Sequence, residues 1–392
     1  MSTVGALLLL IAGVCSLPVV ANAARPVADP TRRYSPWWLP AMVIVELAVF
    51  WLMLHVGVLM VGLALGGFDL VVGQVGAVLL GVSVLLLVGL RLRTAVGVRR
   101  LRRRVAGVVH PARGAGRWRG RPIPTPPGVR EQLFVRWQGD LTLDLVRPDD
   151  DRRALPVMVY VHGGGWTGGD PQRQARDLYH ALALAGWAVV GIRYPFAPDV
   201  AVEDQIETVR AAVRWVRRDL GAHGVDATEV VLAGGSAGGH LAAMATLTAE
   251  HDDEQVAACV GLYGVYDMAN RNRTRATWTT TRDVVMQASY SERPDRYHAV
   301  SPIDHVHADT PPILVVHGTH DTLVPPAEGE QFVEVLQAAD RPVDYVPVYG
   351  AQHAWDALSS ITSRTSAALV RDWLHDNVLD RPVSDGESHR PA

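Results

Sequence analysis

The sequence contains no lysine, so all 37 of its basic side chains are arginine. This absence excludes enzymes that form a Schiff base through a lysine, pyridoxal-dependent enzymes among them, and proteins that need the lysine of a Walker P-loop. Cysteine is scarce as well, because the chain has only Cys15 and Cys259, in two separate apolar stretches. Neither a disulfide framework nor a zinc site can be built from them. We therefore expect no metal ion and no organic cofactor.

Long apolar runs are concentrated in residues 1–92, where they predict a transmembrane region of about three spans, at 4–23, 37–65 and 70–90. Each run has at least the roughly 20 residues that a helix needs to cross a bilayer. The first run has an alternative interpretation as a signal peptide over residues 1–23. A signal peptide normally begins with a basic region, and residues 1–5 contain no basic side chain.

Arginines cluster at two positions next to these apolar runs. Arg25, Arg32 and Arg33 precede the second run, and further arginines begin at Arg91, directly after the third. Three spans with the N-terminus outside would place both clusters in the cytoplasm, as the positive-inside rule prefers. The sequence thus predicts a multi-pass protein of the inner (plasma) membrane with a cytoplasmic C-terminal domain. Glu46 interrupts the second span, where it either marks a functional path or is protonated or packed against a neighbouring helix.

Residues 93–128 read as an Arg-rich juxtamembrane segment followed by a Pro/Gly linker. The arginines between positions 99 and 104 adjoin a membrane span and have no aromatic side chains interleaved. Nucleic-acid binding therefore is not expected, and anionic membrane lipid is the expected partner of this collar. The sequence sets no oligomeric state.

Residues 129–378 alternate between short apolar runs and amphipathic helical patterns. This alternation predicts an α/β domain with a mostly parallel sheet flanked by helices. A hairpin signal, Gln138-Gly139-Asp140, lies near its start. The polar residues 379–392 are predicted to be disordered.

A lone serine follows one of these predicted strands. The apolar run at 230–233 leads into a G-x-S-x-G motif formed by Gly234, Ser236 and Gly238, and a helical Ala/Leu pattern comes next. In a strand–turn–helix context this spacing indicates a nucleophile elbow, whose strained backbone admits only small flanking residues. Ser236 is the candidate nucleophile, and the amide of Ala237 is a candidate donor to an oxyanion. The alternative is a glycine-rich structural turn.

Two later strands end in groups that could activate this serine. Asp321 lies four residues beyond a predicted strand, and His353 follows the last strand. The order Ser236, Asp321, His353 is the one expected for a triad in which the histidine takes the serine proton and the carboxylate stabilises the imidazolium. Asp267, after an earlier strand, is the rival acid.

A glycine run supplies further oxyanion donors. His162-Gly163-Gly164-Gly165-Trp166 follows a predicted strand some 70 residues before the elbow. We expect the amides of Gly163 and Gly164 to complete an oxyanion hole with that of Ala237. A flexible loop without this role is the alternative. Trp166 and Trp355 flank the loop and the base, and we expect them to be walls of a substrate pocket.

Together these motifs resemble the α/β-hydrolase superfamily, specifically bacterial carboxylesterases and lipases with the HGGG oxyanion motif. The stretch His162 to Asp170, HGGGWTGGD, is similar to feruloyl-esterase-like, arylformamidase-like and prenylcysteine-methylesterase-like members. With its N-terminal spans the chain also resembles membrane-anchored actinobacterial esterases. The resemblance implies an α/β-hydrolase fold over residues 129–378, with residues 267–303 as an insertion that either forms a partial lid or packs on the core.

The predicted function is that of a membrane-anchored serine carboxylesterase that cleaves small-molecule or lipid esters through an acyl-Ser236 intermediate. The same machinery permits hydrolysis of N-formyl or other activated amides. A third hypothesis, an inactive hydrolase domain that serves as a binding module, predicts the loss of at least one triad or oxyanion residue, and none is lost.

Overall fold

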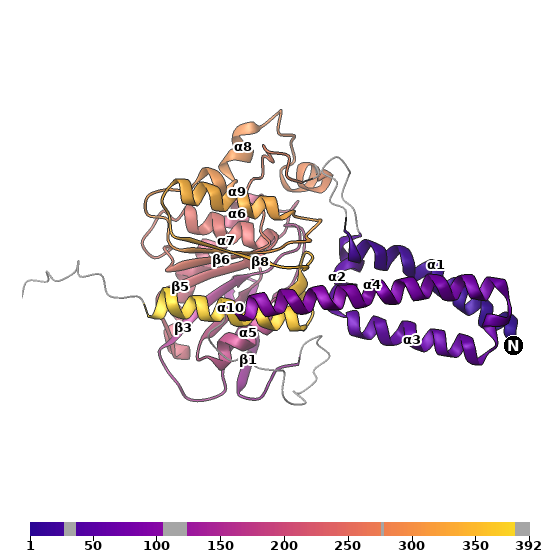
Figure 1. Ribbon diagram of the computed structural model, residues 1–392. Helices are drawn as coiled ribbons and strands as arrows, with labels where there is room; N and C mark the ends of the chain where they lie inside the picture. The colour runs from indigo at the N-terminus through magenta and orange to yellow at the C-terminus, as the bar shows by residue number, and fades with distance from the viewer. Residues whose placement is uncertain (27–36, 105–123, 276–277, 381–392) are drawn as a thin grey trace, which may run out of the picture.

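The computed structural model describes residues 1–26, 37–104, 124–275 and 278–380. A bundle of apolar helices and an α/β domain lie end to end, with the N-terminus at the far end of the bundle (Figure 1). The predicted tail at 379–392 lies almost entirely outside the described residues, as does most of the linker.

The bundle contains α1 (Ser2–Ala24), α3 (Ala48–Ala64) and α4 (Val71–Arg102), which run side by side. Helices α1 and α4 are each long and apolar enough to cross a membrane. Glycines bring them close together, since a Cβ on Gly13 would lie 2.7 Å from the carbonyl oxygen of Gly76. Small residues at such contacts are typical of helices that pack within a bilayer.

The predicted second span, 37–65, is broken. Its first part, α2 (Trp38–Glu46), is bent by 86° from α3, so it completes a third span only if the bent pair is taken as one. The break falls at Leu47, whose φ of −107° and ψ of 25° are not those of an α-helix. Helix α2 packs on α1, and its first residue, Trp38, reaches His353 of the α/β domain. This long-range packing leaves no mark on the apolar pattern of the sequence.

Among the described residues, eight strands form one sheet in the order β1-β2-β4-β3-β5-β6-β7-β8. The first two form the predicted antiparallel hairpin, β2 is also antiparallel to β4, and the remaining neighbours are parallel. The mostly parallel sheet that the sequence predicts is therefore confirmed. The strands are β1 (Val129–Gln138), β2 (Leu141–Pro148), β3 (Leu155–Val161), β4 (Ala188–Ile192), β5 (Val225–Gly235), β6 (Ala258–Leu262), β7 (Ile313–Gly318) and β8 (Val343–Val348).

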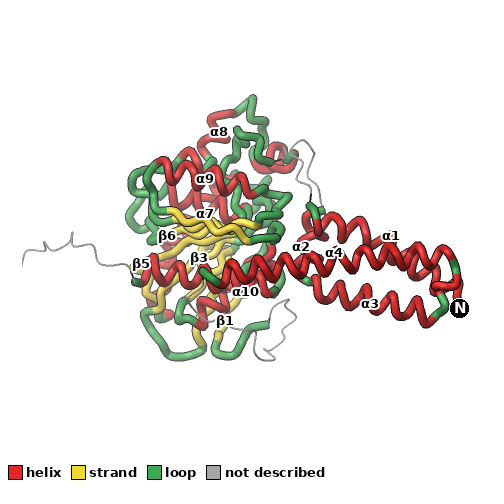
Figure 2. Tube along the Cα trace, in the orientation of Figure 1, coloured by secondary structure: helices red, strands yellow, loops and turns green. Residues whose placement is uncertain are grey.

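Helices cover both faces of this sheet (Figure 2). One apolar core lies between the sheet and α6, α7 and α9, and a second lies on the opposite face against α5 and α10. Successive strand residues serve opposite cores: Val159 packs in the first, and Met158 and Tyr160 pack in the second. The helices of the domain are α5 (Arg176–Leu184), α6 (Val202–Asp219), α7 (Ala237–Leu247), α8 (Pro294–Ala299), α9 (Pro326–Ala338) and α10 (Ile361–Leu374).

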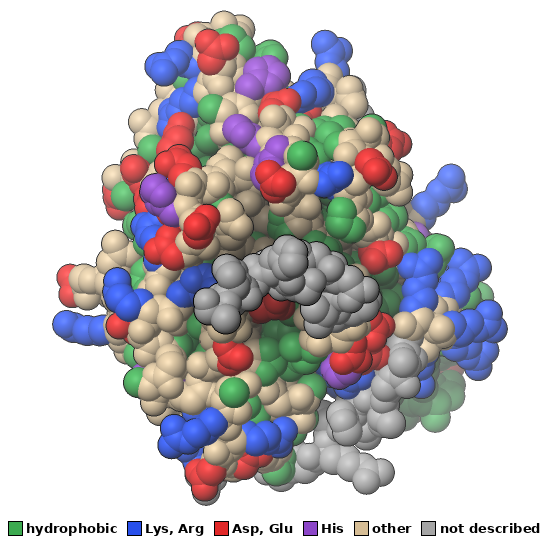
Figure 3. Space-filling model, turned by 90° about the vertical axis from the view of Figure 1, so that its left-hand side faces the viewer, with side chains coloured by type: hydrophobic (Ala, Val, Ile, Leu, Met, Phe, Trp, Pro, Cys, Tyr) green, Lys and Arg blue, Asp and Glu red, His purple; other side chains and the backbone are tan. Residues whose placement is uncertain are grey.

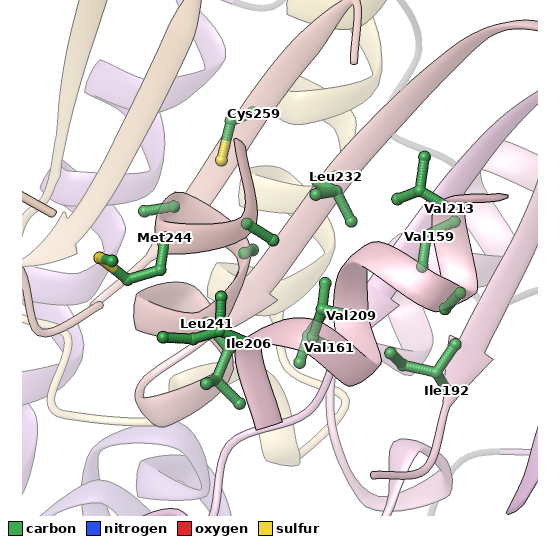
Figure 4. Close-up of a cluster of buried hydrophobic side chains, with 14 of the residues drawn as sticks. Val159, Val161, Ile192, Ile206, Val209, Val213, Leu232, Leu241, Met244 and Cys259 are labelled. Atoms are coloured by element: carbon green, nitrogen blue, oxygen red, sulfur yellow. The ribbon is translucent and has the colours of Figure 1, made fainter. Parts of the chain in front are cut away.

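The stripe of apolar residues on α6 explains why it packs there. Ile206, Val209 and Val213 recur every three or four residues, so they share one helix face. That face meets Val159 and Leu232 of the central strands (Figure 4). The helix thereby supports β3 and β5, whose carboxyl ends carry the glycine loop and Ser236.

Helix α4 runs on past the predicted third span and lies along α10 (Figure 1). Its residues 93–102 were expected to belong to a juxtamembrane segment with lipid as the partner, yet two of its arginines contact the rest of the protein. Arg93 donates hydrogen bonds to His320 Nε2 at 2.7 Å and to the carbonyl oxygen of Ala24 at 2.6 Å. The guanidinium of Arg100 lies 4.7 Å from the ring centre of Tyr349. Arginines of this segment therefore connect the helical bundle with the α/β domain.

Candidate active site

Ser236 stands between β5 and α7 in a strained conformation. Its φ of 55° and ψ of −123° are uncommon for a residue with a side chain. The turn is so tight that a Cβ on Gly234 would lie 2.2 Å from the carbonyl oxygen of Gly238, and one on Gly238 would lie 2.0 Å from that of Val161. Both glycines are therefore required by close backbone contacts. This arrangement holds the Ser236 hydroxyl at the end of the strand.

The structure brings Ser236, His353 and Asp321 into one hydrogen-bonded chain. His353 Nε2 lies 2.9 Å from Ser236 Oγ, and His353 Nδ1 lies 2.7 Å from Asp321 Oδ2. The other carboxylate oxygen of Asp321 accepts hydrogen bonds from the amides of Leu323 and Val324. The carboxylate is thus fixed by its own loop, and the imidazole is oriented with one nitrogen facing the serine hydroxyl.

The electrostatics favour an ionised Asp321. Burial acts to raise the pKa of this carboxyl, but the charge of His353 and hydrogen bonds from His317 and His353 outweigh burial and hold the pKa below its usual value. The rival acid, Asp267, has a different partner: its Oδ2 lies 3.2 Å from Nε of Arg271. Of the two carboxylates, Asp321 is the one placed beside His353.

The glycine loop differs in part from the sequence-based expectation. The amide of Gly163 donates to Oε1 of Gln174 at 2.7 Å, so in this conformation it is not free to bind an oxyanion. A Cβ on Gly163 would lie 3.0 Å from Cβ of Ser236, which places the loop directly against the elbow. Gly164 is exposed and has a φ of 138°. Gln174 lies 11 residues beyond Gly163 in the same connection between β3 and α5, and no motif in the sequence points to it.

Trp166 and Trp355 are core residues here, whereas the sequence suggested pocket walls. Each is at most 2% exposed. The indole of Trp166 donates to His240 Nδ1 at 3.0 Å, and that of Trp355 donates to Ser366 Oγ at 3.1 Å. Because both indoles are enclosed and hydrogen-bonded within the protein, they support the loops that carry the site.

Two aromatic side chains lie against the imidazole of His353, and a buried carboxylate lies behind one of them. The ring of Tyr263 lies 4.7 Å from the imidazole between centroids, and its hydroxyl donates a hydrogen bond to the buried Asp356. Burial raises the pKa of Asp356 to about 6. On another side, the ring of Trp38 at the start of α2 meets the imidazole edge-to-face, with centroids 5.5 Å apart. Trp38 is some 300 residues away in the sequence, in a run that reads as a membrane span, so no local pattern could identify this contact.

The insertion at 267–303 packs on the core over much of its described length. Val285 and Met286 are fully buried in the core, and Trp278 lies beside Trp166 with ring centroids 6.5 Å apart. Tyr290, further along the insertion, is 43% exposed. Of the two alternatives for this insertion, packing on the core fits these residues better than a separate lid.

Comparison with protein families gives a match to the BD-FAE family over residues 143–336. Esterase LipQ of Mycobacterium tuberculosis is 36% identical over 265 residues, which cover 64% of this chain and 61% of LipQ. Esterase LipC of the same organism is 33% identical over 293 residues, which cover 69% of this chain and 72% of LipC. The match thus spans less than two thirds of LipQ but a larger share of LipC.

Solved structures resemble the chain as well. Esterase 2 of Thermogutta terrifontis, phosphonylated by sarin, superposes with a TM-score of 0.52 at 26% identity and covers 65% of this chain and 97% of its own. A truncated carbohydrate esterase from gut microbiota gives a TM-score of 0.55 at 22% identity, covering 63% of this chain and 96% of its own. The second likeness is evidence of a shared fold alone.

Proposed function

Because the chain belongs to the α/β-hydrolase carboxylesterases of the HGGG type, as its relation to LipC shows, we propose that it hydrolyses acyl esters through an acyl-enzyme intermediate on Ser236. The observation that carries this mechanism is the 2.9 Å approach of His353 Nε2 to the hydroxyl of a serine in a strained turn. An imidazole at this distance can take the hydroxyl proton as the oxygen attacks a carbonyl carbon.

The proposed reaction has two halves. Ser236 Oγ bonds to the ester carbon while His353 takes the proton, and the resulting imidazolium is stabilised by Asp321. The tetrahedral intermediate collapses, the alcohol leaves with the proton from His353, and water then attacks the acyl-serine by the same route. The amides of Gly164 and Ala237 are the proposed oxyanion donors, and that of Gly163 would join them once Gln174 releases it. One such donor typically lowers the barrier by about 3 to 4 kcal/mol.

An assay with two substrate classes tests this proposal. The full-length protein in detergent should hydrolyse p-nitrophenyl butyrate and show no comparable turnover of N-formylkynurenine. An arylformamidase would show the opposite preference, and a binding module would hydrolyse neither. Turnover of the formamide alone would overturn the esterase assignment.

We also propose that α1, the α2–α3 pair and α4 anchor the protein in a membrane with the α/β domain in the cytoplasm. The helices expose large apolar side chains such as Phe50, Met60 and Leu85. By contrast, the face of the α/β domain away from the bundle mixes acidic, basic and histidine side chains (Figure 3). Arg93 is hydrogen-bonded to His320 of the α/β domain, and Arg91 shares a pocket with Ser360 and Thr362 of that domain. Both arginines therefore lie where the positive-inside rule expects the cytoplasm.

Reporter fusions test this orientation. Alkaline phosphatase, which folds to an active form only outside the cytoplasm, should be inactive when fused after Arg104, while a fluorescent protein at the same position should fluoresce. An active phosphatase fusion would place the α/β domain outside and refute the proposed topology.

A further inference from the structure

The helical bundle contains a cavity of about 560 Å³ that the proposed mechanism does not use. Its volume lies within the range of small-molecule sites in proteins, about 300 to 1,000 Å³. Helices α1, α2, α3 and α4 all contribute walls, and among the described residues no aspartate, glutamate or arginine lines it. Representative lining residues are Ala12 and Val19 of α1, Leu39 and Val43 of α2, Val58 of α3 and Leu80 of α4. Such a lining suits a hydrocarbon better than water.

The bent helix α2 connects this cavity with the candidate triad. Leu39 and Pro40 line the cavity, and the residue before them, Trp38, has its ring against the imidazole of His353. Because α2 is bent by 86° from α3, it lies across the end of the bundle that faces the α/β domain. The first residue of α2 thus touches His353, while the next two residues line the cavity.

The two polar side chains of α3 in the cavity wall, Trp51 and His55, keep their ring nitrogens buried. His55 is 4% exposed, and its Nδ1 is hydrogen-bonded to the carbonyl oxygen of Trp51 at 2.7 Å. Within the described part of the chain, its other ring nitrogen, Nε2, and the indole nitrogen of Trp51 are buried without a hydrogen-bond partner. Buried polar atoms normally have partners. Because both nitrogens are buried, the surface that the cavity presents to a ligand is apolar, which suits the hydrocarbon chain of a lipid and not its polar group.

We propose that the cavity holds a long acyl chain of a membrane-lipid ester and presents its ester group to Ser236 past Trp38. This proposal rests on the proposed esterase function and adds to it the substrate class, long-chain lipid esters taken from the bilayer around the helices. A lipid is the occupant because α1 and α4 are long and apolar enough to lie in a bilayer, so acyl chains would surround the cavity. The substrate would then travel from the membrane to the serine without crossing water.

Two substitutions on the same helix test the proposal in the full-length protein. Val58 lines the cavity, whereas Val56, two residues earlier on α3, is 44% exposed on the outer surface. Val58→Phe should fill the cavity and lower kcat/KM for p-nitrophenyl palmitate by about tenfold or more, since overfilling an apolar site displaces its ligand. It should leave p-nitrophenyl butyrate turnover unchanged, because a short chain does not need the cavity. Val56→Phe should change neither rate.

A covalent probe locates the acyl chain directly. A p-nitrophenyl alkylphosphonate forms a bond from Ser236 Oγ to phosphorus and releases p-nitrophenolate, and its long chain can carry a diazirine near the far end. After irradiation of the wild-type protein, crosslinks on cavity residues of α1, α2 or α3 support the proposal. Crosslinks confined to the α/β domain overturn it, and they would do so even if Val58→Phe impaired folding.

The two assays separate failure of this inference from failure of the proposed function. If the wild type hydrolyses butyrate and palmitate esters and the two phenylalanine variants behave alike, the cavity is not the acyl site, but the esterase function stands. If the wild type hydrolyses neither ester and the phosphonate does not label Ser236, the esterase function itself fails.

Discussion

Replacing Ser236 with alanine should lower kcat for p-nitrophenyl butyrate by about a million-fold, to near the uncatalysed rate, because a triad acts as a unit and loses nearly all its effect with the nucleophile. In the structure, His353 Nε2 lies 2.9 Å from this hydroxyl. The variant should fold normally, since the alanine removes one oxygen and leaves the tight backbone of the elbow in place. Steady-state kinetics of purified full-length wild type and variant provide the measurement.

Ser291→Ala serves as the matched control for this experiment. Ser291 is an exposed serine of the insertion, remote from the elbow in sequence, and its loss should leave kcat unchanged. Any activity that remains in Ser236→Ala and is absent from a mock purification would come from another nucleophile. Retention of more than about one part in a thousand of the activity in Ser236→Ala would remove Ser236 from the mechanism.

Replacing Asp356 with asparagine should stabilise the protein at neutral pH but not at acidic pH. Burial raises the pKa of this carboxyl from 3.8 to about 6 in the folded protein. Between these pH values the folded state binds more protons than the unfolded state, so stability falls as the pH rises, and above pH 6 the loss is constant. The pKa difference corresponds to at most about 3 kcal/mol. Asparagine removes the charge and still offers an oxygen to the Tyr263 hydroxyl.

The measurement is the melting temperature of wild type and Asp356→Asn in the same detergent between pH 4 and pH 8. The variant should match the wild type near pH 4. Above pH 6 it should melt higher, by about 6 °C if the full difference of about 3 kcal/mol is recovered. Asp140→Asn is the control, because Asp140 is an exposed residue of the hairpin turn and should give no pH-dependent difference. A constant offset across the pH range would show that the Asp356 charge does not destabilise the fold.

Local patterns predicted much of the α/β domain. The elbow around Ser236 and the acid and base after later strands are short motifs whose chemistry depends on near neighbours, and the carboxyl ends of parallel strands meet at one edge. The structure places Asp321 and His353 within hydrogen-bonding distance along this edge, as the order of the motifs suggested.

The contacts that the sequence did not reveal depend on tertiary packing and on how loops fold back on themselves. Trp38 against His353, Gln174 on the amide of Gly163 and Arg93 on His320 each depend on how the bundle and the loops pack. The break at Leu47 has the same origin, because the apolar composition of 37–65 is equally compatible with a straight helix. The sequence shows that Trp166 follows the glycine loop, which is why we expected it in a pocket wall. It does not show which way the indole points, and in the structure the indole is buried in the core.

The continuity of α4 has a consequence for how substrate would be found. Its 32 residues form one unbroken helix, about 48 Å long, that extends from the far end of the bundle to α10. Once α1 and α4 lie in a bilayer, the rigid helix α4 fixes the distance between the triad and the membrane surface. A flexible linker would instead let the α/β domain move over a range of distances from the membrane. The search for substrate then becomes lateral diffusion in two dimensions. Turnover should accordingly follow the mole fraction of the ester in the membrane and not its bulk concentration.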